Sequence, residues 1–578
     1  MQDSGELLQR VIHAIEAGVA SVWMRRGLAV AGVIAIAVIF MYNFRGIATS
    51  QAMDQAQIGR SIATGHGWHT NYARPRAIGQ LQDHDKNVAD RVWVDTANAP
   101  LPPLVNAIAL FPIKSYLKPS QRSPVYAGDK AIACMAILLF LGSVVIQFFV
   151  ASRLFDRFLA LIACALILVC QTMWEYSVSG LPQMLLLFLF SATLYALVRA
   201  VEAKQQGGAV GPWLAGVGAG FGLLALTHGL TIWMFVPALV FIAFFFRPRG
   251  WAAILVLAVF LFLYTPWLIR TWIVCGNPAG ISLYSALEGI NHTEIWWLRH
   301  VDFNPEGVGP GAFRDKAIGN VFAHTGRIFE FLGWSVVALM FFPSLLHLFK
   351  RTETSVVRWM LMAMWGGAVL GMAVFGLSEE QGVAANQLHL LFIPLMTCYG
   401  LAWLLVQWNR LGLQLQLARV LFIGVLFLFC SFPMMTTLSG MLLGRPRASL
   451  RWPPYVPPYI AVLNDWMAPS EVTASDMPWA VAWYADRRSI LLPDTIKALT
   501  DLSDYNTLGG PALALYLTPI SGADNKLRDI TRGDYKEWSS VILQTPDLSK
   551  LPFKWGTLSL GPDKECVFLS DRDRTHGP

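Results

Sequence analysis

The chain has 578 residues, of which 55% are hydrophobic and only 14% charged, and its mean hydropathy is +0.48. These values exclude an ordinary water-soluble protein, because soluble domains carry about 25% charged residues. The net charge of +7 is spread through loops without a basic run, so no nucleic-acid partner is expected. The apolar residues form blocks of about twenty, the length of a membrane-spanning helix, which predicts a polytopic α-helical membrane protein.

The first 26 residues mix polar and apolar side chains, and Leu7, Val11 and Ile15 recur near helical spacing. No small-residue cleavage site follows Arg25-Arg26, so this stretch is not a cleavable signal peptide. Residues 1–26 are therefore predicted to be a cytoplasmic amphipathic segment.

Ten apolar runs follow, at 27–44, 131–151, 158–173, 181–198, 212–246, 251–269, 328–349, 359–377, 388–406 and 420–443. The run 212–246 is too long for one span and has Thr227-His228-Gly229 in its middle, so we interpret it as a hairpin of two spans. The short loops on one side then hold 14 basic residues and those on the other side none. Basic loops stay in the cytoplasm, which predicts eleven spans with the N-terminus inside and the C-terminus outside.

Two long hydrophilic loops, 46–129 and 271–327, then lie outside together with a tail at 445–578, and the membrane domain occupies 27–444. The tail contains short β-like runs, at Val472–Ser475, Ser489–Leu492, Leu513–Leu517, Ser540–Leu543 and Cys566–Leu569. Helical stretches alternate with these runs, which predicts a soluble extracytoplasmic α/β domain with a largely parallel sheet. Asp476, shortly before Pro478, is typical of a helix N-cap.

The first outer loop contains a candidate general base. Gln51–Ala63 predicts a helix with one apolar face on the membrane, and Asp54 lies on it at the edge of a low-dielectric region. The alternative is that Asp54 is an ordinary solvated residue. The spans carry few charges, which disfavours a proton pump or an ion channel. A lipid or polysaccharide transporter, a flippase subunit and a non-catalytic membrane assembly protein remain alternatives to an enzyme.

Four stretches resemble, in order, the GT-C glycosyltransferases, a membrane family that includes protein O-mannosyltransferases and aminoarabinose transferases. They are Gln51–Trp68 with Pro100–Leu104, then Ala225–Gly229, Thr265–Pro278 and Leu388–Met396. The resemblance covers residues 27–443 and implies a GT-C-like fold. It also implies transfer of a sugar, with inversion, from a polyprenyl-phosphate lipid to a hydroxyl of a protein, lipid or glycan outside the membrane.

The same resemblance implies roles for single residues. Asp54 would be the catalytic base, and Arg270, Arg60 and His228 would bind the donor phosphate. The alternatives are an interfacial arginine at 270, reaching toward lipid headgroups, and a buried turn histidine at 228. Candidates for a second acid or an acceptor site are Glu175, Asp90 and Asp95.

The chain departs from the family pattern in three places. The family's second outer-loop acid has no direct counterpart in Ser179–Gln183, where Glu175 or Gln183 are the alternatives. If Arg60 is aligned with the family's arginine, the acidic pair of the motif falls on Gln51-Ala52, and Asp54 lies three residues on, on the same helix face. The lysine expected before Pro102 is missing. We therefore expect no metal site and no other cofactor, with a divalent metal ion as the open alternative.

Overall fold

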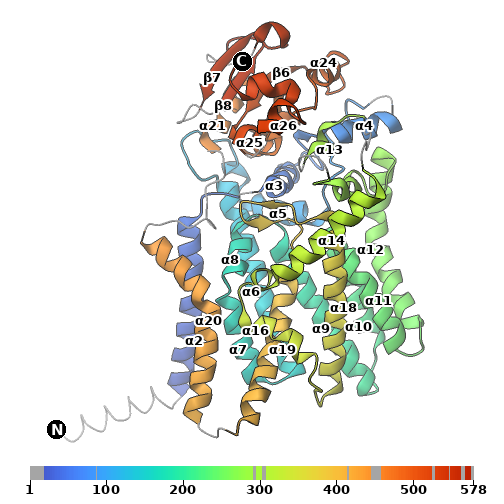
Figure 1. Ribbon diagram of the computed structural model, residues 1–578, viewed down its shortest axis with the longest axis vertical. Helices are drawn as coiled ribbons and strands as arrows, with labels where there is room; N and C mark the ends of the chain where they lie inside the picture. Colours follow the sequence, from blue (N-terminus) through green and yellow to red (C-terminus); the bar gives the residue numbers. More distant parts are fainter. Residues whose placement is uncertain are drawn as a thin grey trace, which may run out of the picture.

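The computed structural model describes residues 19–47, 49–85, 88–290, 295–302, 308–412, 416–443, 457–523, 527–545, 547–560 and 566–574. Three layers follow one another along the long axis of the molecule (Figure 1): a helical bundle, a layer built from the two outer loops, and a C-terminal α/β domain. Most of the predicted N-terminal segment and the Pro-rich junction before the tail lie outside the described residues.

The bundle contains the membrane helices. Seven described helices are long and apolar enough to cross a membrane: α2 (Val19–Asn43), α6 (Ala127–Leu154), α9 (Gln183–Gln205), α12 (Trp251–Cys275), α18 (Thr352–Phe375), α19 (His389–Arg410) and α20 (Gln416–Leu442). The bent pair α7 (Arg157–Leu168) and α8 (Gln171–Val178) accounts for one further predicted span. The run at 212–246 is two shorter helices, α10 (Gly211–Ala225) and α11 (Ile232–Phe245), as predicted. The chain is thus a polytopic helical membrane protein.

The predicted span 328–349 is not one straight helix. It is broken into three four-residue helices, α15 (Ile328–Phe331), α16 (Val336–Leu339) and α17 (Phe341–Ser344). Gly333 and Trp334 both have positive φ, and a Cβ at Gly333 would lie 2.5 Å from Cys170 Sγ. The segment is pressed so closely against α19 that a Cβ at Gly400 would lie 1.8 Å from the carbonyl oxygen of Val337. Broken backbone is tolerated at membrane depth when protein surrounds it.

The short basic loops meet at one end of the bundle. Arg153 donates to Glu202 at 2.9 Å, and Arg351 donates to the carbonyl oxygen of Phe155 at 2.9 Å. Both long outer loops and the C-terminal domain lie at the opposite end (Figure 1). This is the arrangement that the charge pattern predicts; the side of the membrane that each end faces stays a prediction.

The middle layer is built around two packed helices, α3 (Ser50–Ala63) and α5 (Leu101–Leu110). They approach so closely that a Cβ at Gly59 would lie 2.8 Å from the Cβ of Asn106. Sequence alone predicted one apolar face of α3 on the membrane, but polar residues of α3 are buried as well as apolar ones. The reason is that the C-terminal domain covers the upper side of α3. Other helices of this layer are α4 (Pro75–His84), α13 (Trp296–Arg299) and α14 (Pro310–Gly326).

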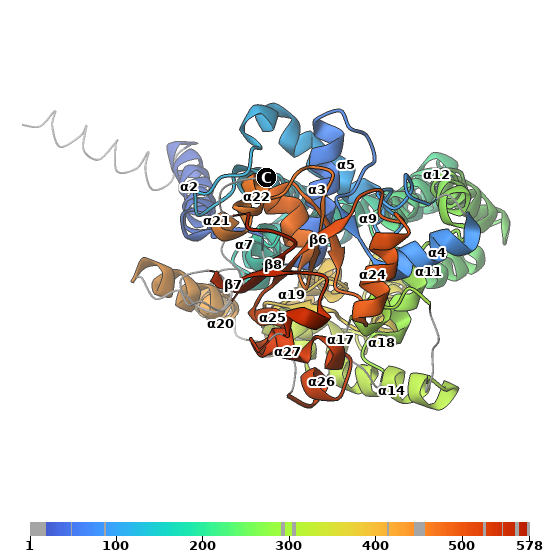
Figure 2. The same ribbon diagram turned by 90° about the horizontal axis from the view of Figure 1, so that it is seen from above.

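The C-terminal domain contains a six-stranded mixed sheet of order β1-β5-β4-β6-β8-β7. Its strands are β4 (Val472–Ser475), β5 (Arg488–Leu491), β6 (Ala512–Leu517), β7 (Trp555–Leu560), β8 (Cys566–Ser570) and β1 (Tyr72–Ala73). β1, β5, β4 and β6 are parallel, whereas β8 pairs antiparallel with β6 and β7. β1 comes from the first outer loop, so the membrane domain supplies an edge strand. The helical segment at Pro478–Ala485 packs on α3. Seen from above, the C-terminal domain leaves α11 and α12 uncovered (Figure 2).

Two local predictions in the tail are wrong. The run Ser540–Leu543 is not a strand, because Ser539–Ile542 forms helix α27. Asp476 does not cap the helix at Pro478; its carboxylate accepts from the backbone N–H of Thr518 at 3.0 Å and from that of Ser521 at 3.4 Å. Asp476 thus binds the start of a helix that lies some 40 residues on in the chain, a partner that local sequence does not reveal.

Candidate active site

The carboxylate of Asp54 is buried in the middle layer and fully surrounded by donors. Asn98 Nδ2 donates to Oδ2 at 2.5 Å, and Gln57 Nε2 donates to Oδ1 at 3.2 Å. Arg74 Nη2 forms an ion pair with Oδ2. Gln57 is one turn further along α3, whereas Asn98 and Arg74 come from later parts of the first outer loop. The loop therefore folds back on α3 and encloses the predicted base.

A second carboxylate, that of Asp95, lies beside the first. Asn98 Nδ2 donates to Asp95 Oδ1 at 3.2 Å, so one amide group bridges both acids. Arg74 Nη1 lies 3.6 Å from the same oxygen. Burial raises the pKa of Asp95, the charge of Asp54 raises it further, and Arg74 opposes part of the rise. Of the three candidates for a second acid, Asp95 is therefore the one that lies beside Asp54.

Arg74 occupies the space between the two acids. Burial lowers the pKa of its guanidinium, but Asp54, Tyr72 and Asp95 together outweigh this effect and raise it, so Arg74 stays charged. A divalent ion shared by Asp54 and Asp95 would have to take the position of this guanidinium. In the part of the chain that the structure describes, no three His, Cys, Asp or Glu side chains come together as metal ligands. The site therefore does not fit a divalent metal.

Arg270 reaches the same cluster from the outer end of α12. Its Nη1 donates to the carbonyl oxygen of Asp95 at 2.8 Å. The guanidinium lies over Trp267 at 4.6 Å, and Trp68 is 6.0 Å away. The aromatic pair fixes the plane of the guanidinium, and its half-buried position leaves donors for another ligand.

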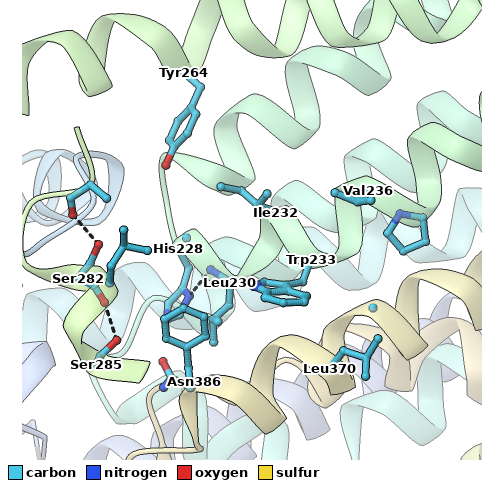
Figure 3. A pocket seen from close by; sticks show the side chains of 16 residues that line it. His228, Leu230, Ile232, Trp233, Val236, Tyr264, Ser282, Ser285, Leu370 and Asn386 are labelled. Atoms are coloured by element: carbon cyan, nitrogen blue, oxygen red, sulfur yellow. Dashed lines mark hydrogen bonds between the residues drawn. The ribbon is translucent and has the colours of Figure 1, made fainter. Parts of the chain in front are cut away.

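A cavity of about 760 Å³ lies between α11, α12, α18 and the 3₁₀ helix η3 (Ser282–Leu287). Figure 3 shows Trp233, Tyr264 and Leu370 around it, each from a different helix. Trp233 and Leu370 are 37% and 55% exposed, which is typical of a surface that faces lipid. His228 and Asn386 lie at the polar part of the wall (Figure 3). The cavity is a preformed apolar site with few polar groups.

The imidazole of His228 is neutral in this wall. Its Nδ1 accepts from the backbone N–H of Leu230 at 3.3 Å. Burial lowers the pKa of His228 to about 4, although a hydrogen bond with Asn386 opposes the shift. A neutral ring whose Nδ1 accepts carries its proton on Nε2, so His228 offers one uncharged donor.

The cavity and the acid pair are connected through the backbone. The wall at Ala279 and Ser282 adjoins Ile281, whose N–H donates to the carbonyl oxygen of Thr96 at 3.4 Å. Thr96 follows Asp95 directly. In addition, Leu101 N–H donates at 3.0 Å to the carbonyl oxygen of Leu226, two residues before His228. Two of the stretches that carry the resemblance, Pro100–Leu104 and Ala225–Gly229, therefore meet at this place.

The other predicted residues lie apart from this cluster. Arg60 is buried against the C-terminal domain, where its two Nη atoms donate at 2.7 Å to the carbonyl oxygens of Trp483 and Ala482 and to Asp486. Asp90 is exposed. Glu175 lies on α8 and accepts a hydrogen bond from Gln171.

Sequence reasoning missed three members of the site. Arg74 and Asn98 are separated from Asp54 by 20 and 44 positions, and no local pattern marks them. Glu380 accepts from Ser50 N–H at 2.7 Å and from Ser50 Oγ at 2.5 Å, at the start of α3. A carboxylate at this helix end is favourable because it offsets the helix dipole. The one local signal is the pair Glu379-Glu380, which lies in a short loop without Lys or Arg.

The chain is similar in sequence to one protein family and in fold to several solved structures. The family model of the dolichyl-phosphate-mannose-protein mannosyltransferases matches residues 126–270. The structure of ArnT from Cupriavidus metallidurans bound to undecaprenyl phosphate is similar, with a TM-score of 0.57 and 14% identity over 97% of this chain and 100% of that one. The chain has the GT-C glycosyltransferase fold.

A second GT-C structure is also similar. It is the oligosaccharyltransferase of Archaeoglobus fulgidus tethered with an acceptor peptide, with a TM-score of 0.52 and 11% identity over 86% of this chain and 70% of that one. No curated protein matches the chain in sequence. The matched region 126–270 spans α6 to α12 and ends at Arg270, so it leaves out Asp54, Asp95 and the C-terminal domain.

Proposed function

We propose that the protein is a membrane glycosyltransferase that moves a sugar from a polyprenyl-phosphate lipid to an acceptor hydroxyl on the extracytoplasmic side. The observation that carries the proposal is the buried Asp54–Asp95 pair, which one backbone hydrogen bond, from Ile281 to Thr96, connects to the wall of an apolar cavity. The GT-C fold and the undecaprenyl phosphate bound to ArnT support a polyprenyl-phosphate donor.

The donor lipid would occupy the apolar cavity with its phosphate toward the acid pair. Arg270 would hold the phosphate, because a guanidinium can bind two phosphate oxygens at once. His228 would add one neutral hydrogen bond. Both groups would stabilise the negative charge that grows on the phosphate as its bond to the sugar breaks. Arg60 would act indirectly, by fixing α3 against the C-terminal domain.

Asp54 would take the proton of the acceptor hydroxyl. The hydroxyl would replace Asn98 as a donor to Asp54, and its oxygen would attack the anomeric carbon as the bond to the phosphate oxygen breaks. Attack opposite the leaving group inverts the anomeric configuration. Asp95 would share the proton that Asp54 accepts, because burial and the charge of Asp54 raise its pKa.

The test uses the full chain in nanodiscs with a polyprenyl-phosphate that carries a radiolabelled sugar. Asp54→Asn keeps the shape of the side chain but cannot accept the proton, so turnover should fall by roughly 10²–10⁴. Donor binding should be retained. Asp90→Asn, which changes an exposed acid of the same loop, is the matched control and should leave turnover unchanged.

The same assay separates the alternatives. A transporter or flippase subunit would move the intact lipid without cleaving its sugar–phosphate bond, and an assembly protein would do neither. Near-normal turnover in Asp54→Asn would move the base to Asp95. Absence of any sugar release from several polyprenyl-phosphate sugars in the wild-type protein would contradict the proposed function.

A further inference from the structure

A second cavity, of about 600 Å³, lies where α3, the 3₁₀ helix η1 (Phe111–Tyr116) and the C-terminal domain meet. Its charged walls are mostly basic, and we call it the basic cleft. The cationic side chains that line it are Arg60, Lys114, Lys118, Arg487 and Arg488, and the only carboxylate among its described lining residues is Asp486. The cleft therefore has an excess of positive charge.

The positive charge comes from α3, from the segment of η1 and from the C-terminal domain. Asp486 is already paired with Arg60 at 2.7 Å, so it does not neutralise the remaining cations. Lys114 and Lys118 are exposed, and Arg488 lies over Trp93 at 5.0 Å. The positive charge also acts on the pKa of His69, a histidine that lines the cleft. Burial lowers the pKa of His69, and the charges of Arg488 and His66 lower it further.

The cleft reaches Asp54 through a single side chain, that of Gln57, which lines the cleft. Its Nε2 donates to Asp54 Oδ1 at 3.2 Å and to Thr70 Oγ1 at 2.6 Å. Its Oε1 accepts from Asn71 N–H at 3.0 Å. The apolar cavity approaches the acid pair from another direction, through Thr96. The basic cleft thus contacts the Asp54 carboxylate through Gln57, whereas the apolar cavity is linked to the backbone next to Asp95.

The basic cleft opens beside an apolar segment of α5 and η1. Ile108, Phe111 and Tyr116 are 65%, 60% and 74% exposed, and Lys114 lies over the ring of Phe111 at 4.9 Å. Exposed aromatic and aliphatic side chains next to lysines are typical of a segment at the membrane interface. A wall of the cleft would therefore lie at the level of the lipid headgroups.

We propose that the basic cleft binds the anionic group of a membrane-anchored acceptor, a phosphate ester at headgroup level, while the donor occupies the apolar cavity. The assignment to the acceptor rests on the proposed function, but binding of the anion itself does not. Gln57 then separates the bound anion from Asp54, so that another hydroxyl of the same acceptor molecule is presented to the base. A soluble phosphate or an acidic protein would not use the apolar rim of the cleft.

The binding experiment uses the full chain in detergent with phosphatidic acid as the probe, and native mass spectrometry as the measurement. Lys114→Gln together with Lys118→Gln should weaken the affinity for phosphatidic acid by roughly 30-fold, because each basic residue near a headgroup contributes about 1 kcal/mol and 1.4 kcal/mol is a factor of ten. Lys497→Gln makes the same charge change at an exposed residue of the C-terminal domain outside the cleft, and should have no effect. The affinity for undecaprenyl phosphate should be unchanged in both variants.

The outcomes separate the sources of the anion. Tighter binding of phosphatidic acid than of glycerol 3-phosphate supports a membrane-anchored acceptor, and equal binding overturns that part of the proposal. Preferential binding of an Asp-rich peptide would assign the cleft to a protein acceptor instead. Unchanged affinity in the double variant would remove the cleft as an anion site. If the cleft binds phosphatidic acid but no sugar is ever transferred, the proposed function fails while the anion site stands.

Discussion

The acid pair and the apolar cavity are neighbours with opposite construction. Around Asp54 and Asp95 the polar groups are closed in by donors from three parts of the first outer loop, with Arg74 at the centre. The cavity has exposed apolar side chains at its edge, and its wall is mostly apolar. A buried pair of charges is stable only when each charge is compensated, whereas an apolar wall needs only shape. Changes in the acid pair should therefore have large effects on both folding and activity, and changes in the cavity should affect donor binding alone.

The largest effect is expected for Arg74→Gln. Removal of the guanidinium leaves two buried carboxylates uncompensated, which should cost about 3–5 kcal/mol of stability and abolish transfer. The pKa of Asp95 is already raised by burial and by Asp54, and it should rise further without Arg74. A group whose pKa is raised in the folded state loses stabilisation as the pH rises, so the variant should become more stable on acidification from pH 8 to pH 5.

Thermal unfolding of the purified protein across this pH range measures the effect of Arg74→Gln. Arg314→Gln, which removes an exposed arginine paired with Asp315, should unfold like the wild-type protein at each pH. An Arg74→Gln protein with wild-type stability and no dependence on pH would show that the two acids are not held as a charged pair.

A smaller effect is expected where the acid pair depends on the C-terminal domain. Ala73 pairs with Ile490 in the sheet and precedes Arg74 directly. Ala73→Pro should weaken the pairing of β1 with β5 and displace Arg74, so kcat should fall at least tenfold while undecaprenyl phosphate still binds. Ala73→Ser, which keeps the strand, should retain most of the activity. Equal loss of activity in both variants would show that the loss comes from the changed side chain at position 73 and not from the pairing of β1 with β5.

Changes in the apolar cavity should affect the binding of the donor more than the rate of transfer. Leu370→Trp would fill part of it and should raise the KM for the donor by a few-fold to tenfold, with kcat nearly unchanged, because the loss concerns binding and not the reacting atoms. Leu428→Trp on α20 is the control, since Leu428 is 55% exposed like Leu370 but does not line the cavity. Steady-state kinetics with varied donor measure both. A fall in kcat at constant KM would place Leu370 near the reacting groups.

The smallest effect is expected for His228→Asn. An asparagine can supply a neutral donor, so the loss should be about 0.5–1.5 kcal/mol in donor affinity. The pKa of His228 is lowered to about 4, so the ring stays neutral between pH 5 and pH 8. The shape of the pH–activity profile should therefore be the same in wild type and variant over this range. A change in the profile near pH 6 would show that His228 titrates during the reaction.

The sequence by itself determined the parts that depend on neighbouring residues. Long apolar runs predicted most of the membrane helices, the hairpin at 212–246 among them, because a helix satisfies its own backbone and its length must match the bilayer. The amphipathic pattern of Gln51–Ala63 predicted the helix that carries Asp54. Order and spacing of four short stretches indicated the GT-C fold before any contact was known.

Only the tertiary structure decided which side chains meet. Arg74 and Asn98 reach Asp54 because the outer loop folds back on α3, and β1 joins a sheet whose next strand lies more than 400 residues on. Arg60 likewise meets partners far along the chain, because its guanidinium donates to backbone carbonyl oxygens of the C-terminal domain. The segment 328–349 is broken because close packing on α19 outweighs its apolar composition. Charge pairing and close packing act through space, so the sequence fixes these contacts only through the whole fold and no local pattern displays them.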